Sequence, residues 1–191
     1  MTFLEPFAFG KLPAHGDFVV RGLGPAQRQA WDSWASNSLS AAGHALGEAF
    51  DALFDVAPPW RFVFGPGPFG HGWRAGALAP SIDRAGRRFP IILGAEGKAE
   101  PDGVYPLELA EQVALVLENQ IYHAFESRGD IDVLIASAQD GLVALRAESQ
   151  MGSEGRFWTL GGSHHPSQTI FANQPPANLL TTVLRCREVP I

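Results

Sequence analysis

Cysteine and long apolar runs are both scarce in this chain of 191 residues. The single cysteine, Cys186, excludes an internal disulfide and a zinc site built from cysteines, and its apolar surroundings favour a packing role. No apolar run approaches the roughly 18–20 residues that cross a bilayer. The first residues lack the basic head and apolar core of a signal peptide, so we expect none. These absences predict a protein of the reducing cytoplasm.

Basic residues are also fewer than acidic ones. Fourteen Lys and Arg residues stand against 20 Asp and Glu residues, which gives a net charge of −6. Nucleic-acid binders and proteins that bind acidic membranes are usually basic, so this balance disfavours both classes. Hydrophobic residues make up 46% of the chain and charged residues 18%, which indicates a packed core rather than a disordered chain. The length predicts one domain, residues 1–191.

Motifs for cofactors and catalysis are missing or out of place. Residues 65–70, GPGPFG, fit G-x-G-x-x-G, but two prolines remove amide donors and a strand-like run follows where a helix is needed. The six histidines show no metal-ligand spacing, and no G-x-S-x-G is present. The sequence therefore predicts no cofactor and no metal.

Apolar periodicity predicts helices and strands interspersed along the chain. Residues 26–53 and 107–126 carry apolar side chains at spacings of three and four, which is typical of amphipathic helices. Gly43 and Gly47 weaken the middle of the first stretch, which leaves open one helix or two helices with a bend. Residues 73–79 and 89–95 are expected to pair as a hairpin with a long charged tip. This alternation predicts an α/β or α+β sandwich around one sheet. The other expected elements are strands at 7–12, 60–64, 156–160 and 169–172, an extended piece at 16–21, and helices near 132–145 and 176–184.

The tip of this hairpin is unusually charged. Within APSIDRAGRRFPIILGA, residues 79–95, Asp83 stands among three arginines between two apolar runs. Asp83 is positioned to pair with Arg87 or Arg88, because a carboxylate accepts two parallel bonds from a guanidinium group. We expect one arginine to stiffen the loop, another to face outward, and Gly86 to adopt a positive φ.

A second polar stretch, KLPAHGDFVVRG, covers residues 11–22. Lys11, His15, Asp17 and Arg21 fall within it, between apolar residues. A turn in which Asp17 accepts backbone amide bonds, with solvated basic groups, is favoured here on residue types alone. The alternative is a polar recognition patch beside the charged hairpin.

These stretches together resemble the TagF family, also called ImpM, of proteins associated with type VI secretion. The resemblance covers nearly the whole chain and is most specific in F-G-K-L-P…G-D-F, at residues 9–18, and P-S-x-D-x-x-G-R-x-F-P, at residues 80–90. It implies a single TagF-like domain with a three-layer αβα sandwich, a mixed or antiparallel central sheet, and no catalytic residues. It also implies a cytoplasmic, post-translational repressor of type VI secretion that binds the forkhead-associated scaffold protein of that system.

The sequence thus predicts a regulator that acts by binding and has no enzymatic activity. We expect it neither to bind nucleic acid nor to insert into a membrane, and its oligomeric state stays open. Two alternatives use the loop of Ser81, Asp83, Arg87 and Arg88 together with His15. One is a hydrolase or phosphate-handling enzyme, and the other is a sensor of an anionic small ligand. The candidate partner-binding residues are Lys11, His15, Asp17, Arg21, Arg61, Ser81, Asp83, Arg84, Arg87 and Arg88.

Overall fold

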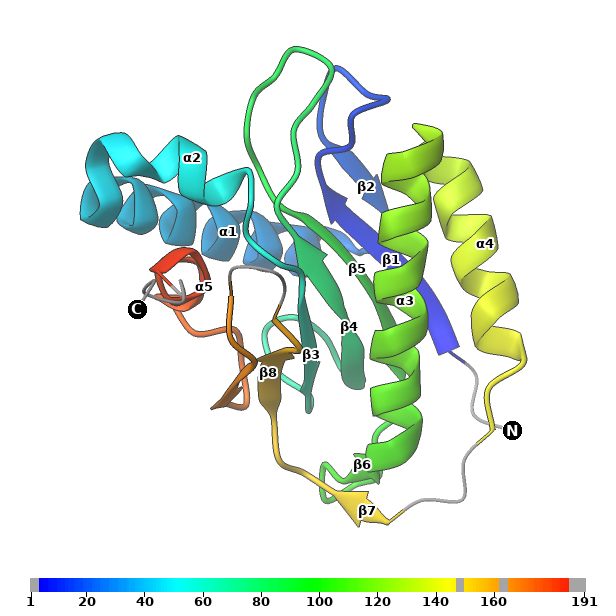
Figure 1. Ribbon diagram of the computed structural model, residues 1–191. Coiled ribbons are helices and arrows are strands. Elements are labelled where there is room, and N and C mark those ends of the chain that lie inside the picture. Colours follow the sequence, from blue (N-terminus) through cyan, green and yellow to red (C-terminus); the bar gives the residue numbers. More distant parts are fainter. Residues whose placement is uncertain (1–3, 147–149, 162–164, 186–191) are drawn as a thin grey trace.

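The computed structural model describes residues 4–146, 150–161 and 165–185. A seven-stranded sheet forms the centre, in the order β2-β1-β5-β4-β3-β8-β9, and all its neighbouring strands are antiparallel (Figure 1). The strands are β1 (Leu4–Gly10), β2 (Val19–Arg21), β3 (Trp60–Phe64), β4 (Trp73–Ala79), β5 (Ile91–Gly97), β8 (Arg156–Thr159) and β9 (Gln168–Phe171). A separate ribbon, which the sequence did not predict, pairs β6 (Tyr105–Pro106) with β7 (Met151–Gly152).

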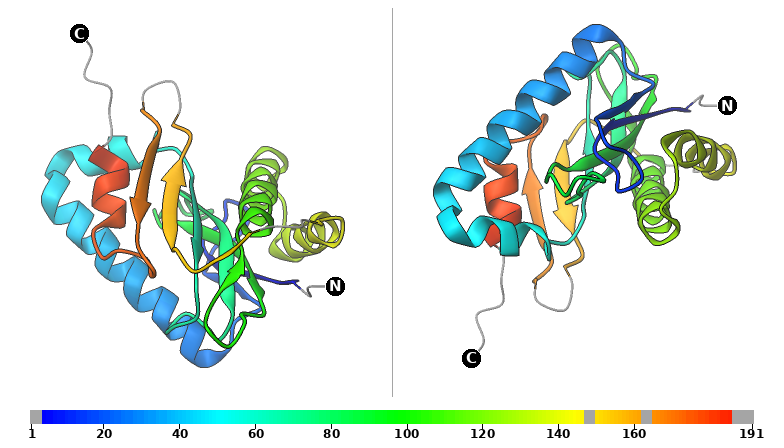
Figure 2. Two further views of the ribbon diagram at one scale, coloured as in Figure 1. Left: turned by 90° about the horizontal axis from the view of Figure 1, so that it is seen from below. Right: turned by 90° about the horizontal axis from the view of Figure 1, so that it is seen from above.

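Helices cover both faces of the sheet, which confirms the three-layer αβα arrangement (Figure 2). One layer holds α1 (Pro25–Leu46), the 3-10 turn η1 (Gly47–Ala49), α2 (Phe50–Phe54) and α5 (Leu179–Arg185). The other layer holds α3 (Leu107–Ser127) and α4 (Ile131–Val143). None of the helices in the described part of the chain has the length and apolar character needed to cross a membrane.

The two faces of the sheet carry different kinds of core. Toward α3 and α4 the strands present small and aliphatic side chains, such as Ala75, Ala77 and Leu93, which pack with Val113 and Leu117 of α3. Toward α1 they present mostly aromatic rings. Alternation along each strand sends neighbouring residues to opposite layers, so both cores are built from the same few strands.

Two glycines at the centre of the sheet make room for the aromatic core. Gly76 of β4 pairs with Gly94 of β5, with Phe7 of β1 beside Gly94 and Phe62 of β3 beside Gly76. A Cβ atom would lie 2.3 Å from the Phe7 ring at position 94 and 2.9 Å from the Phe62 ring at position 76. Trp31 of α1 packs over this row, with its ring centroid 5.9 Å from each phenylalanine.

The structure places the predicted elements with small shifts in their bounds. The helical stretch expected at 26–53 forms two helices, because the turn η1, which begins at Gly47, separates α1 from α2. The hairpin of 73–79 and 89–95 is confirmed as β4 and β5, with Gly76 opposite Gly94. The only cysteine, Cys186, lies outside the described residues.

Candidate functional site

Two charged loops lie side by side at one end of the sheet. Residues 80–90 connect β4 to β5, and residues 11–18 connect β1 to β2 (Figure 1). The Arg84 amide donates to the His15 carbonyl oxygen over 2.8 Å, which ties the two loops together. We call these two loops the charged tip. The two polar stretches of the sequence thus form one surface.

A buried carboxylate organises the charged tip. Asp83 Oδ1 accepts hydrogen bonds from the amides of Ala85 and Arg87, each over 2.9 Å. Its Oδ2 accepts from Arg87 Nε over 2.7 Å and lies 3.0 Å from Lys11 Nζ. Burial disfavours ionisation of Asp83, but these donors hold its pKa well below its usual range. Gly86 has a φ of 80°, which lets the chain turn back around the carboxylate.

The three arginines of the tip have different surroundings. Arg87 is bound to Asp83 and also donates from Nη2 to the Gly16 carbonyl oxygen over 2.5 Å. Arg88 makes a two-pronged contact with Asp55, over 2.8 and 2.6 Å, and hydrogen bonds from Arg88 lower the pKa of Asp55. Arg84 is exposed, and its guanidinium group pairs with no carboxylate in the described residues. Within the part of the chain that the structure describes, Arg84 is therefore the arginine of this loop without a carboxylate partner.

His15 and Arg21 point to α4. The Ile131 amide, in the first turn of α4, donates to His15 Nε2 over 3.1 Å, and Asp130 Oδ2 lies 3.3 Å from the same nitrogen. Arg21 Nε donates to Asp132 Oδ1 over 2.7 Å. Both basic side chains therefore hold the β1–β2 region against the start of α4.

The remaining candidate residues lie in different parts of the fold. Asp17 is exposed, with Oδ1 3.8 Å from Arg87 Nη2, so it belongs to the charged tip. Arg61 does not, because it pairs with Glu118 of α3 from the middle of β3. Ser81 is buried at the base of the loop.

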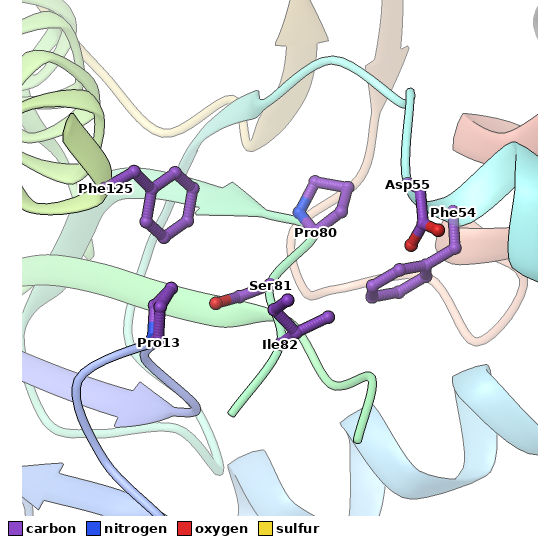
Figure 3. Close-up of a pocket in the computed structure, with 7 residues that line it drawn as sticks. All are labelled: Pro13, Phe54, Asp55, Pro80, Ser81, Ile82 and Phe125. Carbon is purple, nitrogen blue, oxygen red and sulfur yellow. The ribbon is translucent and has the colours of Figure 1, made fainter. Parts of the chain in front are cut away.

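A pocket that the sequence did not predict adjoins Ser81 (Figure 3). Its volume is about 240 Å³. Phe125 falls within the helix expected at 107–126, and nothing in the sequence indicates that Pro13 lies near it. Four segments that are far apart in the sequence meet here, and only the folded sheet brings them together. The lining residues are Pro13, Phe54, Asp55, Pro80, Ser81, Ile82 and Phe125.

The charged tip does not assemble a nucleophile with a base. His15 Nε2 is occupied by the α4 amide, and the Asp83 oxygens are occupied by their four donors. In the described residues, Ser81 Oγ makes no hydrogen bond to either. The described residues also contain no cluster of three or more His, Cys, Asp or Glu suited to a metal ion. The geometry suits polar recognition.

Comparison with known proteins agrees with this architecture. Residues 8–140 match the family model of the TagF N-terminal domain, described as type VI secretion system-associated. No curated protein matches the chain. The crystal structure of PA0076 from Pseudomonas aeruginosa PAO1 has a TM-score of 0.73 at 22% identity, over 98% of both chains, which shows a shared fold. Because the family match spans most of the chain and both loops of the charged tip, this protein belongs to the TagF family associated with type VI secretion.

Proposed function

We propose that this chain regulates type VI secretion by binding a protein component of the system through the charged tip, and that it performs no chemistry there. The observation that carries the proposal is the contrast between Asp83 and Arg84. Asp83 is buried and fixes the loop from inside, while Arg84 is exposed on the same loop and has no partner carboxylate in the described residues.

A loop built in this way suits the binding of a protein. Side chains and loops that are ordered only on association weaken binding, because their lost freedom opposes it. The Asp83 hydrogen bonds and the contact of Arg87 with Gly16 order this loop in the free protein. Arginine is also enriched among the residues that dominate the affinity of interfaces.

The surroundings of the polar groups support binding over catalysis. A hydrolase that used Ser81 would need a base within hydrogen-bond reach, and His15 faces α4 instead. A sensor of small anions would need free guanidinium groups, and Arg87 and Arg88 are paired with carboxylates of the chain. These contacts leave Arg84 for an external partner.

We propose the forkhead-associated scaffold protein of the same secretion system as this partner, with binding in the cytoplasm and repression of secretion as its result. Membership of a family associated with type VI secretion supports a component of that system. In the proposed mechanism, the bound chain covers a surface that the scaffold needs for assembly, so occupancy alone represses secretion.

The proposal is tested with purified scaffold protein and an Arg84→Glu variant. Loss of this cation is expected to weaken binding by about tenfold or more, as measured by isothermal titration calorimetry. Arg28→Glu, at an exposed position of α1, is the matched control and should bind as the wild type does. Both variants should keep the wild-type melting temperature. Unchanged affinity of Arg84→Glu would contradict the proposal.

Charge reversal at Arg88 is a poorer probe of binding. Arg88 contacts Asp51 and Asp55, so a glutamate there would place three carboxylates together. Arg88→Glu is therefore expected to lower the melting temperature, and a loss of binding in that variant would not separate recognition from folding.

A further inference from the structure

The Ser81 hydroxyl is buried and has no hydrogen-bond partner in the described residues. Ser81 is 6% exposed, and its Oγ is fully covered. Buried polar atoms are nearly always hydrogen-bonded, so an unpaired hydroxyl needs an explanation. In Figure 3 this oxygen points into the space between Pro13 and Phe125, within the pocket. A molecule that enters the pocket would reach this hydroxyl only by displacing the atoms that now cover it.

The pocket around this hydroxyl is apolar and carries no uncompensated charge. Its walls come from prolines, phenylalanine rings and the Ile82 side chain. Asp55 is its single charged lining residue, and both oxygens of that carboxylate accept hydrogen bonds from Arg88. A charged group that entered would lose water without gaining a counter-ion, whereas an uncharged group would not. The pocket therefore favours an apolar occupant with one hydrogen-bonding atom.

A second hollow adjoins the pocket. This hollow has a volume of about 450 Å³ and shares Asp55, Pro80 and Phe125 with the first. Pro58, Pro59 and Tyr122 are among its other lining residues. We call the two hollows together the proline groove. Two adjoining hollows fit successive side chains of an extended chain better than one compact small molecule.

Exposed apolar side chains surround the proline groove. Val56 is 52% exposed, Ile82 41% and Tyr122 46%, and each of them lines one of the two hollows. Clustered exposed apolar side chains mark sites of interaction, whereas scattered ones do not. The groove also adjoins the charged tip, because Ser81 and Ile82 begin the loop that carries Arg84. An apolar centre beside a charged rim is the usual composition of a protein interface.

We propose that the proline groove binds an extended, uncharged peptide segment of a partner protein. An apolar side chain of that segment fills the Ser81 pocket, and a backbone carbonyl or amide of the segment hydrogen-bonds to Ser81 Oγ. Aromatic-lined grooves bind extended, proline-containing peptides, whose preformed conformation lowers the entropy lost on binding. The inference deepens the proposed function and rests on it for the identity of the partner, while the groove itself is testable without that partner.

The probe is the capped tetrapeptide acetyl-Ala-Leu-Pro-Ala-amide, titrated into the 15N-labelled protein at millimolar concentration. Amide resonances of Ser81 and Ile82 should shift, and the same peptide with Glu in place of Leu should bind more weakly. Ser81→Ala should lower the affinity for the peptide by roughly 2- to 10-fold, which is the effect of one hydrogen bond. It should not lower the melting temperature of the protein. Ile82→Glu should weaken it by about tenfold or more, because a carboxylate beside Asp55 opposes an apolar occupant.

Val143→Glu is the matched control, because it makes a similar change at an exposed position of α4 away from the groove. Its peptide affinity should equal that of the wild type. The inference is overturned if the uncharged peptide does not bind, if the glutamate peptide binds equally well, or if Ser81→Ala leaves affinity unchanged. A fall in the melting temperature of Ser81→Ala would assign the hydroxyl to folding. Concentration-dependent dimerisation abolished by Ile82→Glu would assign the groove to a second copy of this chain.

The scaffold assay separates this inference from the proposed function. If the scaffold binds the wild type but not Arg84→Glu, and Ile82→Glu binds it normally, the charged tip acts alone and the groove proposal fails. If the tetrapeptide shifts the groove resonances and the scaffold does not bind at all, the groove stands and the proposed partner is wrong.

Discussion

Lys11 Nζ lies 3.0 Å from Asp83 Oδ2, and both side chains are buried where the two loops of the charged tip meet. Lys11 follows β1, and Asp83 lies between β4 and β5, so this pair joins segments that are 72 positions apart (83 − 11). The Lys11 ammonium group also lies 5.1 Å from the centre of the Phe18 ring. The pair fixes the shape of the surface that we propose to bind a partner.

Replacing the carboxylate of this pair should destabilise the protein more than replacing the cation. Asp83→Asn leaves the buried Lys11 without a counter-charge and leaves Arg87 with only the exposed Asp17. Lys11→Met leaves Asp83 bound to Arg87. Thermal melts should show a fall of several degrees for Asp83→Asn and a smaller fall for Lys11→Met. Asp17→Asn, an exposed carboxylate of the same tip, serves as the control and should melt with the wild type.

Acid should remove the same stabilisation. Burial opposes the charge of Asp83, yet its hydrogen bonds depress its pKa far below the ordinary value of 3.8. A carboxyl group with a depressed pKa in the folded state stabilises the protein above about pH 4, and this contribution is lost as the pH falls toward the folded-state pKa. Urea midpoints measured from neutral pH to about pH 2 should therefore fall less steeply for Asp83→Asn than for the wild type. Parallel curves for the two proteins would contradict this assignment.

A second buried ion pair should respond asymmetrically to mutation. Arg74 Nη2 donates to Glu96 Oε2 over 2.5 Å, and burial lowers the pKa of Arg74. Glu96→Ala leaves a buried cation alone and should cost about 3–5 kcal/mol. Arg74→Met should cost far less, because Glu96 is partly exposed and still accepts from the Gly72 amide over 2.6 Å. Chemical unfolding of both variants tests this order, and equal losses would disprove it.

The central glycines predict a contrast between two Gly→Ala substitutions. At Gly94 the added methyl group would collide with the Phe7 ring, and overpacking of this kind costs about 1–3 kcal/mol. At Gly43, in α1, it would meet nothing within 4 Å, so Gly43→Ala should stabilise the protein by about 0.4–1 kcal/mol. The free energy of unfolding in urea gives both values. A stabilised Gly94→Ala variant would show that the ring can move aside.

The sequence alone predicted those elements whose residues interact with near neighbours in the chain. The spacing of Val113, Leu117 and Ile121 predicted α3, and the charged stretch between two apolar runs predicted the hairpin of β4 and β5. The pairing of Asp83 with an arginine four residues away also follows from local chemistry. Such patterns are readable because the interacting residues are close in the chain.

Long-range partners were not readable in this way. Nothing local indicates that Arg61 turns to Glu118 on α3, or that His15 meets the first turn of α4. The proline groove is a stronger case, because Pro13, Phe54 and Phe125 come from three distant segments. Proline and phenylalanine occur throughout the sequence, so only the folded sheet selects these three.

The charged tip touches both helical layers, since His15 contacts α4 and Arg88 contacts Asp51 of α2. A protein seated on it would act as a clamp across all three layers at one end of the sheet. The layers could then separate only after the partner has dissociated. A bound partner should therefore slow proteolytic cleavage even at peptide bonds that it does not cover.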